Sequence, residues 1–295
     1  MKRTLSLFLA LLLLLPAAAG AETVVTSFYP VWLLALNLTD GIDGMEVVNM
    51  AEPSTGCLHD YTLQNSDMVT LSGADVLLVN GSGMESFLPV VTGAYPALPV
   101  VDATAGLPYL SESGIVEIGE AEEGEAVNAH LWLDPQRAAG MAANLADGLI
   151  RLFPDREQLI TENLEQLRKR LLALDETLRD ELKGKDRKVI IFHEAFPYFA
   201  EACGLSVAAI VNKEPEDDLS SAQLARILAL VREEDSLPLI IKSAETDRSV
   251  DVLVSEAELP VCVLDPLTTG PADPPLDYYE AVMLRNMKAL LEAEN

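Results

Sequence analysis

The chain has 295 residues and a mass of 31.9 kDa, which is long enough for one large domain or two ordinary ones. Hydrophobic residues make up 49% of it, and the 17 prolines and 17 glycines are scattered, which excludes a disordered, collagen-like or coiled-coil chain. The 47 Asp and Glu outnumber the 20 Lys and Arg, giving a formal net charge of -27. This charge disfavours nucleic acids and anionic lipid surfaces and favours cationic ligands.

The amino terminus has the pattern of a secretory signal peptide. Two basic residues precede an apolar run over residues 7–15, which is too short to span a bilayer. The small residues 19–21 fit a cleavage site, so we expect residues 1–21 to be removed and the mature chain to begin at Glu22. The first cysteine is Cys57, so no lipid-modified cysteine is expected at the mature terminus. These features predict a soluble periplasmic protein without membrane insertion.

Short β-branched runs alternate with helical patterns along the chain, which is typical of parallel sheets covered by helices. In the first half, strands are predicted over residues 24–27, 46–50, 75–80 and 98–102, and helices over 31–38 and 65–72. In the second half, strands are predicted over 188–192, 206–211, 237–241 and 261–264, and helices over 220–233 and 276–291. The predicted fold class is α/β, with two lobes that each hold a four-stranded parallel sheet flanked by helices.

A long amphipathic helix is predicted between the two halves. Residues 155–182 contain no Pro or Gly and place seven leucines at three-, four- and five-residue spacings. At about 1.5 Å per residue such a helix spans roughly 40 Å, enough to join two lobes as one rigid connector. The predicted domains are a signal peptide (1–21), an N-terminal α/β lobe (22–153), the connecting helix (154–184) and a C-terminal α/β lobe (185–295).

The chain has an odd number of cysteines, namely Cys57, Cys203 and Cys262. In an exported protein this allows at most one internal disulfide. Cys203 and Cys262 lie in the same half and are candidates to pair, but two buried unpaired thiols fit the sequence equally well.

The candidate chemistry lies in the three histidines of the chain, His59, His130 and His193. His59 and His130 lie in turn-rich segments, whereas His193 directly follows a predicted strand, as Asp265 does. Ligands of open α/β sheets bind beyond the carboxyl ends of the strands, so these four side chains could converge in a cleft between the lobes. Three imidazoles and a carboxylate suit zinc, although a capping, core or turn role for any one of the four residues stays open at this point.

Several motifs resemble the metal-binding receptors of zinc and manganese ABC importers, in the order of that family and over nearly the whole mature chain. These motifs are His59-Asp60-Tyr61, Asn65-Ser66-Asp67, Gly83-Met84-Glu85-Ser86-Phe87, His130-Leu131-Trp132-Leu133-Asp134-Pro135, Phe192-His193-Glu194-Ala195-Phe196-Pro197-Tyr198-Phe199 and Leu264-Asp265-Pro266-Leu267. The resemblance implies two α/β lobes, one rigid connecting helix, one metal ion in the cleft and delivery of that metal to a membrane permease.

The resemblance assigns metal ligation to His59, His130, His193 and Asp265. Manganese receptors of this family tend to carry a carboxylate where this chain has His193, and imidazole suits zinc better than manganese. We therefore expect a monomeric receptor that binds one Zn2+ per chain. A manganese receptor and an adhesin of the same fold are the alternatives.

The fourth ligand is open from the sequence. Cys57 lies two residues before His59, and it is an alternative to Asp265, as are Glu245 and water. Zinc receptors of this family often carry a His-rich acidic loop, but residues 117–125 are acidic without any His. We expect this stretch to be a solvated surface or a weak attractor of cations.

A zinc hydrolase is the competing function from another class. It would need an open coordination position and a general base, which Glu194 could supply. The HExxH signature is absent, since Pro197 stands where its second histidine would be, and a ligand at Asp265 would close the site. We therefore expect no enzymatic activity.

Overall fold

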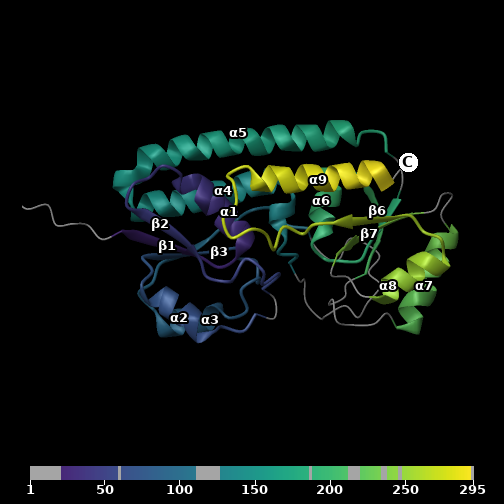
Figure 1. Cartoon of the computed structure of the whole chain (residues 1–295), viewed down its shortest axis with the longest axis horizontal. Helices are drawn as coiled ribbons and strands as arrows, with labels where there is room; N and C mark the ends of the chain where they lie inside the picture. The colour runs from purple at the N-terminus through teal and green to yellow at the C-terminus, as the bar shows by residue number, and fades with distance from the viewer. Residues whose placement is uncertain are drawn as a thin grey trace, which may run out of the picture.

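The computed structural model of the chain describes residues 21–58, 61–110, 127–185, 188–211, 220–233, 238–244 and 248–293. Four features of the sequence lie outside this part: residues 1–20 of the predicted signal peptide, His59, the acidic residues 117–125 and Glu245. Two parallel sheets lie next to one another beneath a long helix (Figure 1). Within the described ranges, no helix is both long and apolar enough to cross a bilayer.

The first sheet has the strand order β2-β1-β3-β4, and all of its strands are parallel. Its strands are β1 (Glu22–Thr26), β2 (Met45–Asn49), β3 (Val76–Val79) and β4 (Val100–Asp102). In the central strand, Val25 lies opposite Val48 on one side and Leu77 on the other. Every residue of β3 is buried, as expected for the middle of a parallel sheet that is covered on both faces.

Helices cover both faces of this sheet. They are α1 (Tyr29–Thr39), α2 (Asn65–Ser72), α3 (Leu88–Ala94) and α4 (Pro135–Leu152). The start of α4 is fixed by Asp134, whose side chain accepts hydrogen bonds from the backbone N–H groups of Gln136 and Arg137. Because α4 begins directly after the segment that contains His130, this cap also fixes the position of that segment.

The second sheet repeats the first, with the strand order β6-β5-β7-β8 and all strands parallel. Its strands are β5 (Lys188–Ile191), β6 (Ser206–Ile210), β7 (Leu239–Ser243) and β8 (Val261–Leu264). Its helices are α6 (Phe196–Ala202), α7 (Ser221–Glu233), α8 (Arg248–Glu256) and α9 (Tyr278–Ala293). All eight predicted strands are thus found, with ends shifted by up to two residues.

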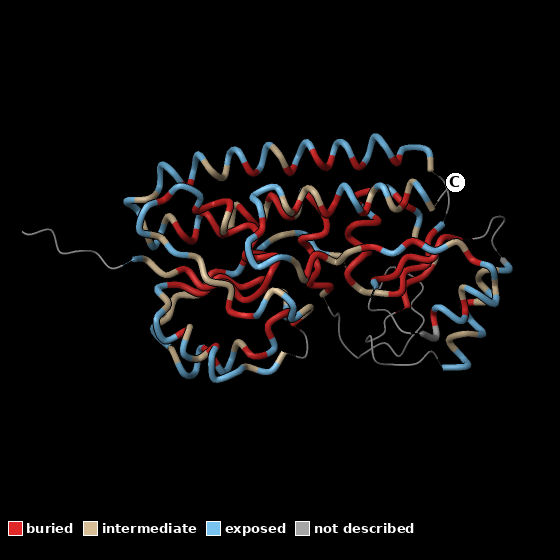
Figure 2. The backbone as a smooth tube through the Cα atoms, viewed as in Figure 1, coloured by how far each residue is buried: buried red, intermediate tan, exposed pale blue. Residues whose placement is uncertain are grey.

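The predicted connector is confirmed as α5 (Glu157–Glu181), which follows a short 3-10 turn at Pro154–Arg156. Its 25 residues span roughly 40 Å along the back of both lobes (Figure 1). It contacts α1 and α4 of the first lobe and α6 and α9 of the second. Figure 2 shows its inner face buried and its outer face exposed, as the leucine stripe predicts. The domain limits at residues 153 and 184 stay a prediction.

One hydrophobic core runs through both lobes. Successive residues of β5 show how it is divided, because Val189 and Ile191 join this shared core whereas Ile190 and Phe192 face the other side of the sheet. That other side forms a small second core together with side chains from α7 and α8. Since the larger core is continuous, hydrophobic burial holds the two lobes against each other.

The three cysteines, all of which lie in the described part, form no disulfide. Cys203 and Cys262 are both buried, so the alternative of two unpaired buried thiols is the one that the structure adopts. Burial raises the pKa of the Cys262 thiol to about 12 and also raises the pKa of Cys203, which leaves both as neutral thiols.

Candidate metal centre

Three of the four predicted ligands lie in the described part of the chain. His193 follows β5 and Asp265 follows β8, so both lie beyond carboxyl ends of strands, as predicted. β5 lies between β6 and β7, where the order of the second sheet reverses, and this is where open α/β sheets bind ligands. His130 immediately precedes a single 3-10 turn, η2 (Leu131–Leu133), ahead of α4.

His130 is held in one tautomer by Asn128. The imidazole is 1% exposed, and the Asn128 side-chain oxygen Oδ1 lies 3.0 Å from both the backbone N and the ring Nδ1 of His130. An amide oxygen only accepts hydrogen bonds, so Nδ1 carries the ring proton and Nε2 keeps its lone pair. This is the tautomer that a metal-binding imidazole requires.

Asn128 also joins the two lobes. Its Nδ2 donates to the backbone oxygen of Glu194 at 2.6 Å, and its own backbone oxygen accepts from the Tyr198 hydroxyl at 2.7 Å. Glu194 lies between β5 and α6, and Tyr198 lies in the first turn of α6. Sequence reasoning missed Asn128, although a polar residue two positions before a histidine in a turn-rich segment is the signal that could have indicated it.

The lone pair of His130 faces a thiol and a carboxylate. The Cys57 Sγ atom lies 3.6 Å from Nε2, and the Glu194 Oε1 atom lies 3.7 Å from the same nitrogen. The side chain of Glu194 is 32% exposed, whereas His130 is almost fully buried. Two atoms able to bind a metal therefore lie beside the one nitrogen that is prepared to bind it.

His193 lies beside His130, with 6.1 Å between the ring centroids and an edge-on arrangement. The backbone N–H of Ala195 donates to His193 Nδ1 at 3.1 Å, so the neutral ring carries its proton on Nε2. Phe196 packs against the ring at a centroid distance of 5.4 Å. Metal binding through Nε2 thus requires this ring to turn or to move its proton, in contrast to His130.

Trp132 ties the histidines to the loop after β8. Its ring lies 4.9 Å from that of His130, and its Nε1–H donates to the backbone oxygen of Pro266 at 2.9 Å. The Tyr279 hydroxyl donates in turn to the backbone oxygen of Trp132 at 2.6 Å. These bonds fix the position of His130 relative to the second lobe.

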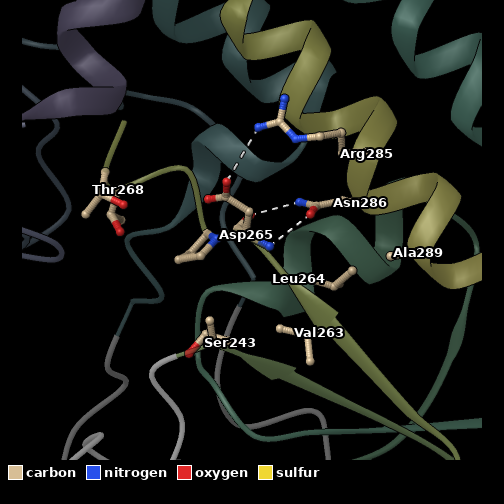
Figure 3. A pocket seen from close by; sticks show the side chains of 11 residues that line it. Ser243, Val263, Leu264, Asp265, Thr268, Arg285, Asn286 and Ala289 are labelled. Carbon is tan, nitrogen blue, oxygen red and sulfur yellow. Dashed lines mark hydrogen bonds and ion pairs between the residues drawn. The ribbon is translucent and has the colours of Figure 1, made fainter. Parts of the chain in front are cut away.

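Asp265 makes a different set of contacts (Figure 3). Its Oδ1 accepts from the backbone N–H of Leu267 at 2.8 Å, and its Oδ2 lies 3.8 Å from an Arg285 guanidinium nitrogen. It lines a cavity of about 420 Å3 together with Arg285 and Ser243, and neither His130 nor His193 lines that cavity. The structure therefore describes the Asp265 carboxylate as the partner of a cation on α9.

The described residues do not by themselves complete a metal site. Among them, no group of three or more His, Cys, Asp and Glu side chains is arranged to hold a metal ion. His59 lies outside the described residues, so the part of the predicted site that the structure brings together is His130 and His193, with Cys57 and Glu194 beside them.

The buried Glu85 carboxylate holds the His130 segment in place through Asn80. The Glu85 carboxylate accepts from the Ser27 hydroxyl at 2.8 Å and from the backbone N–H groups of Asn80 and Gly81 at 2.7 and 3.0 Å. The Asn80 side chain then donates to the backbone oxygen of Ala129, the neighbour of His130, at 2.9 Å. Burial raises the pKa of Glu85, although all three donors favour its ionised form.

Comparison with known proteins identifies relatives over nearly the whole chain. The zinc-binding lipoprotein AdcA of Streptococcus pneumoniae is 26% identical over 285 residues, which cover 92% of this chain and 56% of AdcA. This chain thus spans about half the length of that relative. The high-affinity zinc uptake system protein ZnuA of Yersinia pestis is 27% identical over 286 residues, which cover 88% of each protein.

The fold is shared with solved structures. FpvC of Pseudomonas aeruginosa, solved in complex with Mn2+, superposes with a TM-score of 0.81 at 24% identity and covers 93% of this chain and 98% of its own. The family model described as the periplasmic component A of the zinc-uptake complex matches residues 24–293. This chain therefore belongs to the family of zinc-uptake complex component A proteins.

Proposed function

We propose that this protein is an extracytoplasmic receptor that captures one Zn2+ between its lobes and delivers it to the permease of an ABC importer. The observation that carries the proposal is the state of His130, which is 1% exposed and presents an unprotonated Nε2 beside His193. A buried histidine fixed in this tautomer by an amide oxygen is typical of metal ligands. The names of the relatives AdcA and ZnuA support zinc as the cargo.

The ligands in this proposal are His59, His130 and His193. Asp265 stays a prediction as the fourth ligand, because the contacts described for its carboxylate are to Arg285 and the backbone of Leu267. Imidazole nitrogens favour zinc over manganese, which prefers oxygen ligands. The receptor is therefore proposed to select zinc, although FpvC, of the same fold, was solved with Mn2+.

Zinc binding would use ligands from both lobes. His130 lies in the segment that precedes α4, and His193 lies at the end of β5 in the second sheet. Asn128 already connects these segments through its bond to the Glu194 backbone, so little rearrangement is needed to bring both imidazoles to one ion. A ligand set drawn from both lobes orders the residues around the bound ion, and a permease can distinguish this local order from that of the empty receptor.

The amino terminus and the partner of the receptor are proposed as follows. Residues 1–21 are proposed to act as a signal peptide that is removed on export, and the mature receptor is proposed to be a monomer. The partner is a membrane permease, and the net charge of -27 disfavours nucleic acid as a ligand. We propose no enzymatic role.

The test is metal content and competitive affinity of the metal-stripped mature protein for Zn2+ and Mn2+. One tightly bound zinc per chain, lost in both His130→Ala and His193→Ala, supports the receptor. Gln158→Ala, an exposed polar residue on α5, is the control and should bind zinc like the wild type. No tight zinc binding, or binding that is unchanged in His130→Ala, contradicts the proposal.

A further inference from the structure

Cys57 differs from the other two cysteines of the chain in its surroundings. Cys203 and Cys262 are buried, and each is 2% exposed. Cys57 is partly exposed, and its Sγ atom lies 3.6 Å from His130 Nε2. It follows β2 and precedes α2, in the segment that continues into His59. Its thiol therefore lies next to the proposed ligand His130 rather than in the core.

The distance between these two atoms matches the edge of a zinc tetrahedron. Zinc binds sulfur at about 2.3 Å and imidazole nitrogen at about 2.0 to 2.1 Å, and a tetrahedral angle between the two bonds separates sulfur from nitrogen by about 3.6 Å. Cys57 Sγ and His130 Nε2 lie 3.6 Å apart. The separation of the two atoms therefore fits one zinc ion bound by both.

The tautomer of His130 agrees with this distance. Since Asn128 fixes the ring proton on Nδ1, Nε2 can only accept, and the Cys57 thiol lies 3.6 Å from it, with the Glu194 carboxylate at 3.7 Å. The same arrangement permits an S–H···N hydrogen bond in the metal-free protein. When a metal binds, the thiol loses its proton to solvent, and the thiolate and the imidazole then bind the same ion.

The carboxylates nearby do not occupy the position that Cys57 would take. Asp265 is paired with Arg285 (Figure 3). Its Oδ1 also accepts from the backbone N–H of Leu267. The Glu194 carboxylate lies 3.7 Å from His130 Nε2 and is about one-third exposed, which leaves it accessible to water. Of these groups, the thiol has the contact that best fits a fourth ligand.

We propose that Cys57 is the fourth zinc ligand of this receptor and sets its preference for zinc over manganese. The inference rests on the proposed function and deepens it, because it names the residue that would discriminate between the two metals. A thiolate is a soft ligand that favours zinc, whereas manganese prefers carboxylate, carbonyl and water oxygens. Cys57 and His130 would together supply two of the four ligands of a tetrahedral zinc site.

The first experiment uses the unmodified mature protein with Co2+ as a spectroscopic probe. A cobalt ion bound by Cys57 should show the near-ultraviolet thiolate-to-cobalt charge-transfer absorption, and no variant is needed to see it. The band should disappear in Cys57→Ser and persist in Asp265→Asn. Serine keeps the size and the hydrogen bond of the side chain, so a role limited to hydrogen bonding would survive this change.

The second experiment is the competitive affinity of the same variants for Zn2+ and Mn2+. Cys57→Ser should weaken zinc binding by more than the roughly 10- to 100-fold that is typical of residues that only orient a ligand. Manganese binding should change much less, so the ratio of the zinc affinity to the manganese affinity falls. Alkylation of Cys57 by iodoacetamide should also be slowed by bound zinc.

The outcomes separate this inference from the proposed function. If the wild type binds zinc through His130 but shows no charge-transfer band, or if Cys57→Ser keeps the zinc affinity and selectivity of the wild type, Cys57 is not a ligand and the inference is wrong. The proposed receptor function would then be retained, with a residue other than Cys57, or water, as the fourth ligand. If the wild type binds no zinc, or His130→Ala leaves its affinity unchanged, the proposed function itself fails.

Discussion

At the scale of single residues, His130 and His193 differ in how far they are prepared for a metal. Asn128 Oδ1 fixes His130 with its Nε2 unprotonated, whereas the Ala195 N–H occupies Nδ1 of His193. Metal binding through Nε2 must therefore displace the Ala195 contact at His193, whereas the ring proton of His130 is already on Nδ1. In the proposed receptor, His130 is therefore the fixed ligand and His193 is the ligand that adjusts.

The first prediction concerns Asn128. Asn128→Ala removes the oxygen that orients the His130 ring, so zinc affinity should fall by roughly 10- to 100-fold while the fold is kept. The measurement is competitive zinc titration, with circular dichroism as a check of folding. Asn144→Ala is a matched control, because the Asn144 side chain donates only to the backbone oxygens of Ala103 and Ala105. An equal loss in both variants would contradict an orienting role.

The second prediction concerns the pH dependence of stability at Glu85. Burial raises its folded-state pKa above the ordinary 4.5, so the folded protein holds this proton more tightly than the unfolded chain. The stability linked to Glu85 is fully present below pH 4.5 and is lost as pH rises through the folded-state pKa. The free energy of unfolding of the wild type minus that of Glu85→Gln should therefore fall as pH rises from 4.5.

Urea unfolding at a series of pH values measures this difference. Glu165→Gln, which removes an exposed carboxylate from α5, is the matched control. A rise in the Glu85 difference with pH, or the same fall in the control, would show that another group carries the effect.

Some of these residue roles could be predicted from the sequence and others could not. His130 and His193 are candidates from the sequence because few residue types bind metals, and His193 also because strand ends are known binding positions; their binding of a metal stays a prediction. The contact of Asn128 with Glu194 joins residues 66 positions apart, and no local pattern encodes it. The same holds for Glu85, since a buried acid in a short motif cannot be told from an exposed one by sequence alone.

At the scale of elements, hydrophobic periodicity predicted the secondary structure of the long or strongly patterned segments. The leucine stripe predicted α5, and the β-branched runs predicted all eight strands. The helix α4 was not predicted by name, although its apolar residues, many of them alanine and glycine, are gathered on one buried face. Those small residues let α4 lie close to β4.

The third prediction tests this close approach. A Cβ atom at Gly148 would lie 2.5 Å from a methyl carbon of Val101, a stiff β-branched residue on β4. Gly148→Ala should therefore lower the free energy of unfolding by about 1–3 kcal/mol, as overpacking does. The measurement is urea or thermal unfolding.

Gly93 in α3 is the matched control, because a Cβ there would meet no atom within 4 Å. Gly93→Ala should be neutral or should raise the free energy of unfolding by up to about 1 kcal/mol, since alanine favours the helix. Equal effects of the two substitutions would mean that helix propensity, and not packing against β4, decides the stability of α4.

At the scale of the whole molecule, the two lobes are joined by far more than one helix. The main hydrophobic core contains residues of both, including Tyr29 and Tyr279. The Tyr29 hydroxyl donates to the backbone oxygen of Pro271 at 3.1 Å, and Trp132 Nε1 donates to that of Pro266. Separating the lobes would expose apolar surface and break bonds to buried polar groups, both of which cost free energy.

The fourth prediction follows from this shared core. Because the lobes are packed together and α5 and α9 run side by side along their back (Figure 1), zinc binding should proceed through small shifts of His193 and its loop rather than through a hinge motion. Small-angle scattering of the metal-stripped and zinc-loaded mature protein should give the same radius of gyration within error. A clear contraction on zinc binding would mean that the core between the lobes opens without metal, and that a permease reads domain closure instead of local order around the bound ion.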